Sequence, residues 1–282
     1  MRLAGRSRAG QAGPDGGRLI CMHAHASPPT GILFENISFY YPETDRLVFS
    51  DLSLELPRGV VTLVGQNGTG KSTLLLLASG ILLPAEGRVA IQGVDTRQLR
   101  EESDRQRFVS FVYQNMEFET EEPVGALLEY VQAHGYQERK DPSLRTELVE
   151  VCELQKLLGK RTQELSKGEL QRAIVAFSLL YGSRILMMDE PIFALEERQK
   201  TRIMEFLVDF VHRESLSLYY SVHELEISRK YSDYLLLFYK SGPPRLGPTE
   251  ELFRREEIEK AYQVPYILLK RKEALIRESL MK

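Results

Sequence analysis

The stretch from Val60 to Thr73 reads VVTLVGQNGTGKST, and it decides how the rest of the chain is interpreted. Its first five residues form an apolar run, its middle is rich in glycine, and a helix-like run continues to Ala78. A strand, a glycine-rich turn and a helix in this order can form a loop whose backbone N–H groups surround phosphate oxygens. The stretch therefore predicts binding of a nucleoside triphosphate.

The residue types in this loop suit that chemistry. Glycine at positions 65, 68 and 70 allows a tight turn and a close approach of phosphate. The helix start offers unpaired N–H groups and the positive end of the helix dipole. We expect Lys71 to reach the outer phosphates and Ser72 to give its hydroxyl to Mg²⁺, which prefers oxygen ligands. The loop residues assigned to the nucleotide are Gly65, Gln66, Asn67, Gly68, Thr69, Gly70, Lys71, Ser72 and Thr73.

Other interpretations of the loop are weaker. The dinucleotide fingerprint G-x-G-x-x-G begins at Gly68 but requires glycine at position 73, where this chain has threonine. A small-molecule kinase or a GTPase is disfavoured because the chain has no N-K-x-D motif for reading a base. A chance glycine-rich turn remains an alternative for the motif taken alone.

Composition limits the class of protein. The chain has 282 residues, 43% of them hydrophobic, which suffices for one large or two modest domains. A net charge of −3 gives no basic field, so we expect no nucleic-acid partner. Two cysteines, Cys21 and Cys152, are too few for a disulfide framework and favour a reducing compartment. No apolar stretch approaches the roughly 18–20 residues of a membrane span.

Hydrophobic patterning predicts the fold class. Short, closely spaced strands at 32–41, 47–49, 52–56 and 88–91 indicate an antiparallel sheet. Later strands at 108–113, 185–188, 218–222 and 234–239 alternate with helical patterns at 121–158, 173–181 and 203–211. This alternation indicates a parallel sheet with helices on both faces. Ser166 is expected to cap the start of the helix that includes 173–181. We expect an α/β P-loop NTPase core with a mixed, mainly parallel sheet, an antiparallel β subdomain and an inserted helical subdomain.

Three domain-level segments are expected. Residues 1–31 are rich in Gly, Ala, Arg and Pro and are predicted to be a disordered extension. Residues 32–242 form the nucleotide-binding domain, with the helical subdomain inserted at about 115–180. Residues 243–282 form a C-terminal helical appendix, which is charged and expected to be mostly solvated.

Polar residues follow the later strands. Gln114, Asp189 and His223 each come directly after a predicted strand, and ligands bind at the carboxyl ends of parallel strands. We expect Asp189 to hold Mg²⁺, through a water, and Gln114 to touch Mg²⁺ or the attacking water. Glu190 is placed to deprotonate that water, and His223 to hydrogen-bond the γ-phosphate.

These motifs together resemble the nucleotide-binding subunit of an ATP-binding cassette (ABC) transporter, over about residues 34–240. The segment LSKGE at 165–169 is similar to the family signature L-S-G-G-Q, and Asp189-Glu190 matches its second nucleotide motif. The resemblance implies that Tyr41 stacks on adenine, that Glu190 is the catalytic carboxylate, and that ATP and Mg²⁺ are the cofactors. Residues 32–242 would then be the ABC ATPase domain.

The resemblance also implies partners. Two cassettes, as a homodimer, would sandwich two ATP molecules, with Ser166 and Gly168 of each chain meeting the γ-phosphate held by the other. Membrane-spanning permease subunits and a substrate-binding protein are expected, as in metal-chelate or cobalamin importers, with this chain peripheral on the cytoplasmic side of the cell membrane. Candidates for the groove that receives a permease helix are Met116, Phe118 and Val124, with packing in the core as the alternative for each.

Two departures from the family pattern stand out. Lys167 replaces a usual glycine of the signature and is expected to point outward. The run IFALE at 192–196 replaces the usual T-S-A-L-D, with Phe193 in place of serine and Glu196 in place of aspartate. This puts communication between the two sites of a dimer in question. The alternative function is a non-transport cassette that acts as an ATP-switched interaction module.

Overall fold

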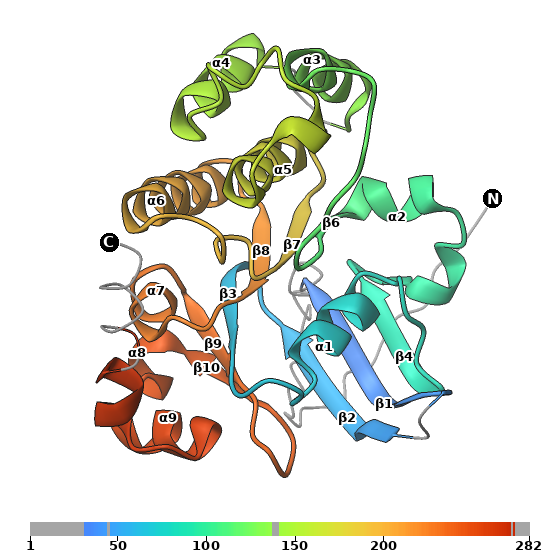
Figure 1. Ribbon diagram of the computed structural model, residues 1–282. Helices are drawn as coiled ribbons and strands as arrows, with labels where there is room; N and C mark the ends of the chain where they lie inside the picture. The colour runs from blue at the N-terminus through green and yellow to red at the C-terminus, as the bar shows by residue number, and fades with distance from the viewer. Residues whose placement is uncertain (1–30, 44–45, 137–140, 272, 274–282) are drawn as a thin grey trace, which may run out of the picture.

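The computed structural model describes residues 31–43, 46–136, 141–271 and 273 (Figure 1). The predicted disordered extension, apart from Gly31, and Cys21 lie outside the described residues. The described chain is built around two β-sheets. Their arrangement confirms the predicted α/β class with an antiparallel and a mainly parallel sheet.

The first sheet is antiparallel. Its strand order is β2 (Arg46–Leu56), β1 (Ile32–Tyr41), β4 (Glu86–Ile91) and β5 (Val94–Asp95). The two strands expected at 47–49 and 52–56 form one continuous strand, β2. The strand continues through Ser50 and Asp51, the polar residues between the two predicted strands, because Asp51 adopts φ 50° and the β1–β2 register shifts nearby. An irregularity of this kind bends a strand without ending it.

The second sheet carries the phosphate loop. Its order is β10 (Arg245–Pro248), β9 (Tyr234–Leu237), β3 (Gly59–Val64), β8 (Ser217–Ser221), β7 (Ile185–Asp189) and β6 (Val109–Val112). Strands β9, β3, β8, β7 and β6 run parallel, and β10 pairs antiparallel with β9. All parallel strands therefore end at one edge, where the predicted site residues follow them.

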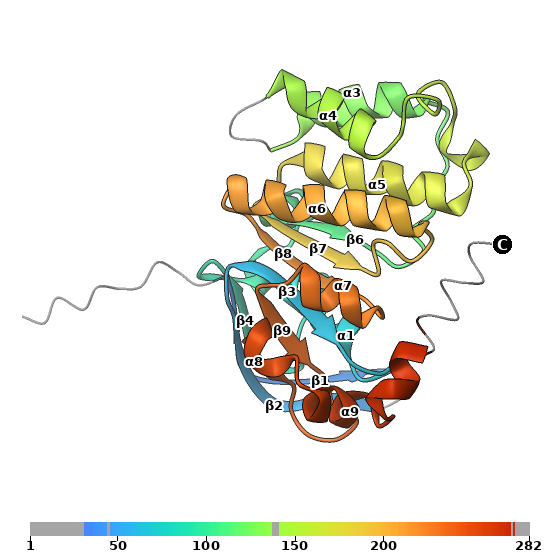
Figure 2. The ribbon, with the colours of Figure 1, turned by 90° about the vertical axis from the view of Figure 1, so that its left-hand side faces the viewer.

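The core lies on both faces of this sheet. Val60 packs towards helices α5 (Lys167–Tyr181) and α6 (Glu197–Arg213), whereas Val61 packs towards α1 (Lys71–Ala78) and the antiparallel sheet. Burial on both faces explains why these strands are nearly continuous apolar runs. Figure 2 shows α3 (Val124–His134) and α4 (Pro142–Val151) as a further layer outside α5.

The helical pattern expected over 121–158 is interrupted. α3 ends before Gly135, and α4 begins with Pro142, the Asp141 carboxylate accepting the Ser143 N–H at 2.8 Å. Proline at a helix start and a capping aspartate define a new helix. Cys152 follows α4 and is buried in the core, as predicted, where burial raises the pKa of its thiol to about 12.

The C-terminal appendix is packed, not mostly solvated as predicted. Helices α8 (Thr249–Leu252) and α9 (Arg255–Tyr262) cover β9 and β3, with Leu252 and Ile258 buried in one cluster with Leu235 and Leu237. The charged residues that suggested a solvated helix lie on the opposite face. Two further short helices are α2 (Glu102–Phe108) and α7 (Leu225–Lys230), and 3₁₀ turns lie at Thr96–Gln98 and Thr162–Glu164.

Candidate functional site

The phosphate loop joins β3 to α1. The N-cap of α1 is Gly70, with φ 103°, and no side chain caps the first turn. A Cβ at residue 70 would also lie 3.0 Å from the Phe49 ring and 3.1 Å from Val48 Cγ1. Glycine is therefore required for both the backbone angle and the packing. The first N–H groups of α1 remain available to a ligand, as an anion site requires.

Lys71 lies inside the loop. Its side chain is largely buried, and its ammonium donates to the carbonyl oxygens of Gly65 and Gln66, both at 2.9 Å. Burial lowers the pKa of Lys71, while the carboxylates of Glu190 and Asp189 oppose that shift. The ammonium is thus positioned within the loop before any phosphate arrives.

A cavity of about 320 Å³ collects most of the predicted site. One side of the cavity is formed by the phosphate loop, and another by residues that follow the ends of β6 and β7. The predicted residues that line it are Tyr41, Asn67, Gly68, Gly70, Lys71, Ser72, Thr73, Gln114, Asp189 and Glu190. Arg46 and Val48 also line it and were not predicted.

Three predicted loop residues support the cavity without lining it. A Cβ on Gly65 would lie 2.6 Å from the Phe238 carbonyl oxygen, so this position fits against β9's end. The Gln66 carboxamide donates to the Tyr262 carbonyl oxygen, at the end of α9. The Thr69 hydroxyl donates to the Gln66 carbonyl oxygen at 2.8 Å and closes the turn.

The antiparallel sheet contributes one wall of the cavity. The Tyr41 hydroxyl shares a hydrogen bond with the Thr73 hydroxyl at 3.0 Å, and Arg46 donates to the Gly68 carbonyl oxygen at 2.7 Å. Arg46 pairs with Tyr41 across β1 and β2, and its contact with Gly68 spans 22 residues, which the sequence pattern did not reveal. These bonds attach the first sheet directly to the phosphate loop.

The acidic pair ends β7. Asp189 is mostly buried and accepts a hydrogen bond from the Ser221 hydroxyl at 2.5 Å, while the Glu190 N–H donates to the Ser221 Oγ at 3.0 Å. Ser221 lies opposite Asp189 in the β7–β8 register and is fully buried. Its supporting role was not predicted, because only the strand pairing places it beside the acids. Glu190 has φ 53°, a backbone angle that commonly marks functional positions.

His223 reaches the site through Glu190. Its Nε2 lies 2.6 Å from the Glu190 Oε1, although His223 itself is not part of the cavity wall. The pair joins Glu190, directly after β7, to His223, two residues after the end of β8. An imidazole at this place can orient a carboxylate that handles a proton.

Ser166 and Gly168 lie at the start of α5 and not around the cavity. The Glu169 carboxylate accepts the Ser166 N–H at 2.8 Å, and the Ser166 Oγ accepts the Glu169 N–H at 3.3 Å. This is a capping box, so Ser166 is the helix cap that the sequence predicted. A Cβ on Gly168 would lie 2.7 Å from the Ala194 carbonyl oxygen. Lys167 is exposed, as expected.

The oxygen donors suit a magnesium ion held together with a nucleotide. Ser72, Gln114 and Asp189 supply hydroxyl, amide and carboxylate oxygens to the same cavity. Within the described ranges, no cluster of three His, Cys, Asp or Glu side chains could hold a metal by itself. Mg²⁺ bound by one or two protein oxygens plus phosphates fits this set, whereas a metal cage of protein groups alone does not.

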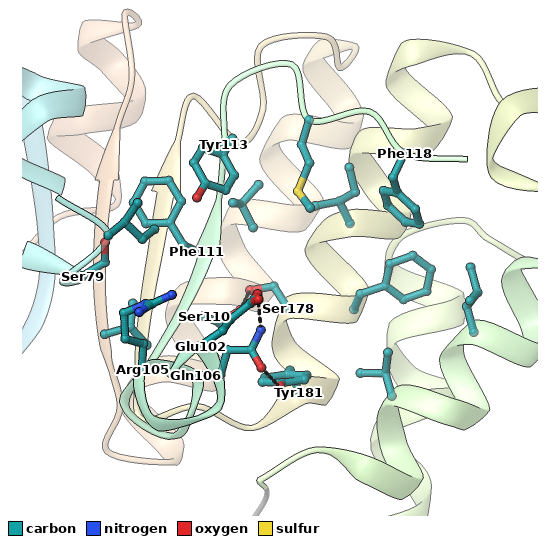
Figure 3. Close-up of a pocket in the computed structure, with 18 residues that line it drawn as sticks. Ser79, Glu102, Arg105, Gln106, Ser110, Phe111, Tyr113, Phe118, Ser178 and Tyr181 are labelled. Carbon is teal, nitrogen blue, oxygen red and sulfur yellow. Dashed lines mark hydrogen bonds between the residues drawn. The ribbon is translucent and has the colours of Figure 1, made fainter. Parts of the chain in front are cut away.

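A second cavity, of about 510 Å³, lies between α2 and β6 on one side and α3 and α5 on the other (Figure 3). Met116 and Phe118 line it, as do the exposed Tyr113 and the polar residues Glu102 and Arg105. Val124, the third candidate, does not line this cavity and is fully buried in the core, which is the alternative that the sequence left open for it.

Comparison with known proteins agrees with this geometry. The family described as ABC transporter matches residues 49–193. A relative from Methanosarcina mazei is 31% identical over 239 residues, which cover 79% of this chain and 50% of that relative. The energy-coupling factor transporter ATP-binding protein EcfA1 of Lactobacillus johnsonii is 28% identical over 263 residues, which cover 88% of this chain and 92% of that relative. The chain thus spans half the length of the Methanosarcina relative and nearly all of EcfA1.

A solved structure shares the fold. That structure is cbiO1 from Clostridium perfringens, part of the ABC transporter complex cbiONQ, with a TM-score of 0.65 and 22% identity over 82% of this chain and 93% of that one. The fold and the phosphate loop define a P-loop nucleotide-binding protein. The chain belongs to the ABC transporter family, as an ABC-type ATPase.

Proposed function

We propose that the chain hydrolyses ATP to power the transport of a substrate across a membrane through separate membrane-spanning partners. The observation that carries this proposal is the cavity that joins Lys71 and Ser72 to Gln114, Asp189 and Glu190. The relatives that are named as transporter ATP-binding proteins support the transport role.

ATP binding would use both sheets. The adenine would stack on Tyr41, beside Arg46, and the phosphates would lie among the N–H groups of the loop and of the first turn of α1. Lys71 would exchange its bonds to the Gly65 and Gln66 carbonyl oxygens for bonds to the outer phosphates. Ser72, Gln114 and Asp189 would hold Mg²⁺, which neutralises phosphate charge when it is bound.

Hydrolysis would be assisted by Glu190. The carboxylate would accept a proton from the attacking water, whose oxygen forms the new bond to the γ-phosphorus as the bond to the leaving ADP oxygen breaks. His223, 2.6 Å from Glu190, would orient the carboxylate and hydrogen-bond the γ-phosphate. Asp189 is held in place by Ser221 and would not need to move.

A second copy of the chain would complete the site. Ser166 is exposed and Gly168 lies beside it, but neither lines the cavity of its own chain. They would reach the γ-phosphate held by the partner, so the working form would be a homodimer. The exposed ring of Phe193, 62% accessible, follows the acidic pair by three residues and would face the same interface.

The second cavity would receive a helix from a permease subunit. Its floor is apolar, with Phe118 and Phe177 6.4 Å apart, and Glu102 and Arg105 give it a polar end (Figure 3). An amphipathic helix fits such a groove. The inserted helical subdomain, about 115–180, would form one wall of it. In the part of the chain that the structure describes, no helix has the length and apolarity of a membrane span.

The activity is tested by measuring Mg²⁺-dependent ATP hydrolysis for the unaltered chain and for Glu190→Gln. Loss of a general base typically costs about 10²- to 10⁴-fold in rate. We expect a loss in this range with ATP affinity retained; equal turnover in the variant would contradict the role of Glu190. Recovery of the tagged chain with membranes tests the transport role, and recovery only from the cytosol would favour the non-transport module.

A further inference from the structure

The segment that follows His223 is attached to α6 by an ion pair whose ammonium is buried and whose carboxylate, that of Glu224, is 22% exposed. Lys200, in the second turn of α6, is only 2% exposed. Its ammonium lies 2.6 Å from the Glu224 Oε1 and 3.1 Å from the Glu197 Oε1. Glu224 is the residue directly after His223, so this pair acts on the chain next to the proposed catalytic centre.

The Glu224 side chain interacts with Lys200 and not with the helix that it precedes. Glu224 occupies the N-cap position of α7, but its side chain makes no capping hydrogen bond. Its Oε2 is buried and finds no hydrogen-bond partner among the residues described. The next N–H, that of Leu225, is bonded instead by the Glu273 carboxylate at 2.6 Å. The contact with Lys200 therefore fixes the direction of the Glu224 side chain and the backbone beside His223.

Stability alone does not explain this arrangement. Removing an ammonium from water is costly, and well-packed apolar residues often stabilise a core at least as well as a buried ion pair does. What a buried, hydrogen-bonded pair does supply is a defined position for both partners. Here Glu224 is joined by one peptide bond to His223, whose Nε2 lies 2.6 Å from the Glu190 Oε1.

We propose that Lys200 is a positioning residue for His223. It fixes the backbone at Glu224 so that the imidazole meets the Glu190 carboxylate, and it does so from the helix that begins directly after the 192–196 loop. Lys200 contacts neither the nucleotide cavity nor Glu190. This inference rests on the function proposed above, in which His223 and Glu190 assist hydrolysis.

The structure offers a matched control. Lys230, at the end of α7, makes an ion pair with Glu205 of α6 at 2.9 Å, so it joins the same two helices as Lys200 and Glu224. This second pair is exposed, at 59% and 53%, and lies at the opposite end of α7 from His223. Lys230→Met therefore removes an α6–α7 charge pair without touching the segment beside His223.

The test is a double-mutant cycle on steady-state ATP hydrolysis in the full chain. We expect Lys200→Met to lower kcat about tenfold with KM changed less than twofold, Lys200→Arg to recover most of the rate, and Lys230→Met to change neither. In a His223→Ala background, Lys200→Met should have no further effect, because residues that act through one another are not additive. If Lys200→Met lowers kcat by the same factor in the His223→Ala background as in the unaltered chain, the proposal is overturned.

Two measurements separate the other outcomes. Lys200→Met combined with Glu224→Gln removes the closer ion pair as a unit, and the remaining carboxylate, Glu197, is 34% exposed and can be solvated. This double variant should stay slow while melting cooperatively. Normal kcat in this double variant would overturn the proposal while leaving His223 and Glu190 in their roles. If His223→Ala hydrolyses ATP normally, the proposed role of His223 fails, and Lys200 cannot act through it.

Discussion

The starts of α1 and α5, each with glycine beside it, are built in opposite ways. α1 begins after Gly70 with no side-chain cap and no acidic residue in its first turn. α5 begins after Ser166 with a complete capping box, whose acidic member is Glu169. The first helix leaves its N–H groups for a ligand, whereas the second satisfies two of its own.

The difference shows where a phosphate can be held by a single chain. At α1, Lys71 and the free N–H groups supply positive charge within a cavity. At α5, the Glu169 carboxylate already occupies the place near the helix start that an anion would take. The signature segment therefore suits contact with a phosphate that another group has positioned, and it does not suit binding a nucleotide alone.

Among the variants that compare the two helix starts, the largest expected effect comes from Lys71→Met. Loss of charged hydrogen bonds, worth about 1.5–3 kcal/mol, predicts roughly a 10- to 100-fold weaker ATP affinity. Titration with a fluorescent ATP analogue measures it. Lys160→Met is the matched control, because Lys160 lies beside Glu169 of the signature segment at 3.5 Å. Equal loss in both variants would contradict the difference between the two helix starts.

Gly168→Ala should affect turnover and spare binding. The added Cβ would lie 2.7 Å from the Ala194 carbonyl oxygen, so the 192–196 loop must shift, at a typical cost of about 1–3 kcal/mol. We expect kcat to fall about tenfold with ATP affinity unchanged. Gly70→Ala, which is strained at φ 103°, should instead weaken ATP binding. The reverse pattern for this pair of variants would be evidence against the two roles.

Ser166→Ala tests the cap itself. Loss of an N-cap side chain lowers the free energy of unfolding by about 0.5–2 kcal/mol. Urea denaturation should show this loss, and ATP binding by the phosphate loop should be unaffected. Ser166→Thr retains a capping hydroxyl and should remain close to the unaltered chain. A cap variant as stable as the original would mean that the capping box contributes nothing.

The smallest effect is the pH dependence due to Glu169. Hydrogen bonding to the Ser166 N–H lowers the pKa of this carboxyl below 4.5 in the folded chain. The unfolded chain then binds the proton more tightly, so the stabilisation is present above pH 4.5 and is lost as pH falls through the lowered pKa. Glu169→Gln should remove this part of the dependence in unfolding curves above and below pH 4.5. An unchanged dependence would contradict the assignment.

The sequence predicted the features that depend on local patterns. The loop around Lys71 and the cap at Ser166 depend on residues within one turn of each other, and both were predicted at the correct positions. The two-sheet fold class also followed, because alternation of strands and helices is visible in hydrophobic periodicity. Assignment of each site residue to its chemical role remains a prediction.

The features that were missed depend on contacts between distant segments. Arg46 contacts Gly68 of the phosphate loop, 22 residues further along the chain, and Ser221 supports Asp189 through the β7–β8 register. The packing of Ile258 against β9 was hidden by the charged residues of the same helix. Register and packing across many residues are not encoded in a local pattern, so no motif could have shown them.

The central claim is that one chain holds the phosphates and a second chain supplies the signature segment. The most direct test mixes two inactive variants, Lys71→Met and Gly168→Asp, and measures Mg²⁺-dependent ATP hydrolysis. In a mixed dimer, the intact phosphate loop of one chain meets the intact signature of the other, so we predict that activity returns on mixing. A mixture no more active than either variant alone, with mixed dimers shown to form, would contradict the claim.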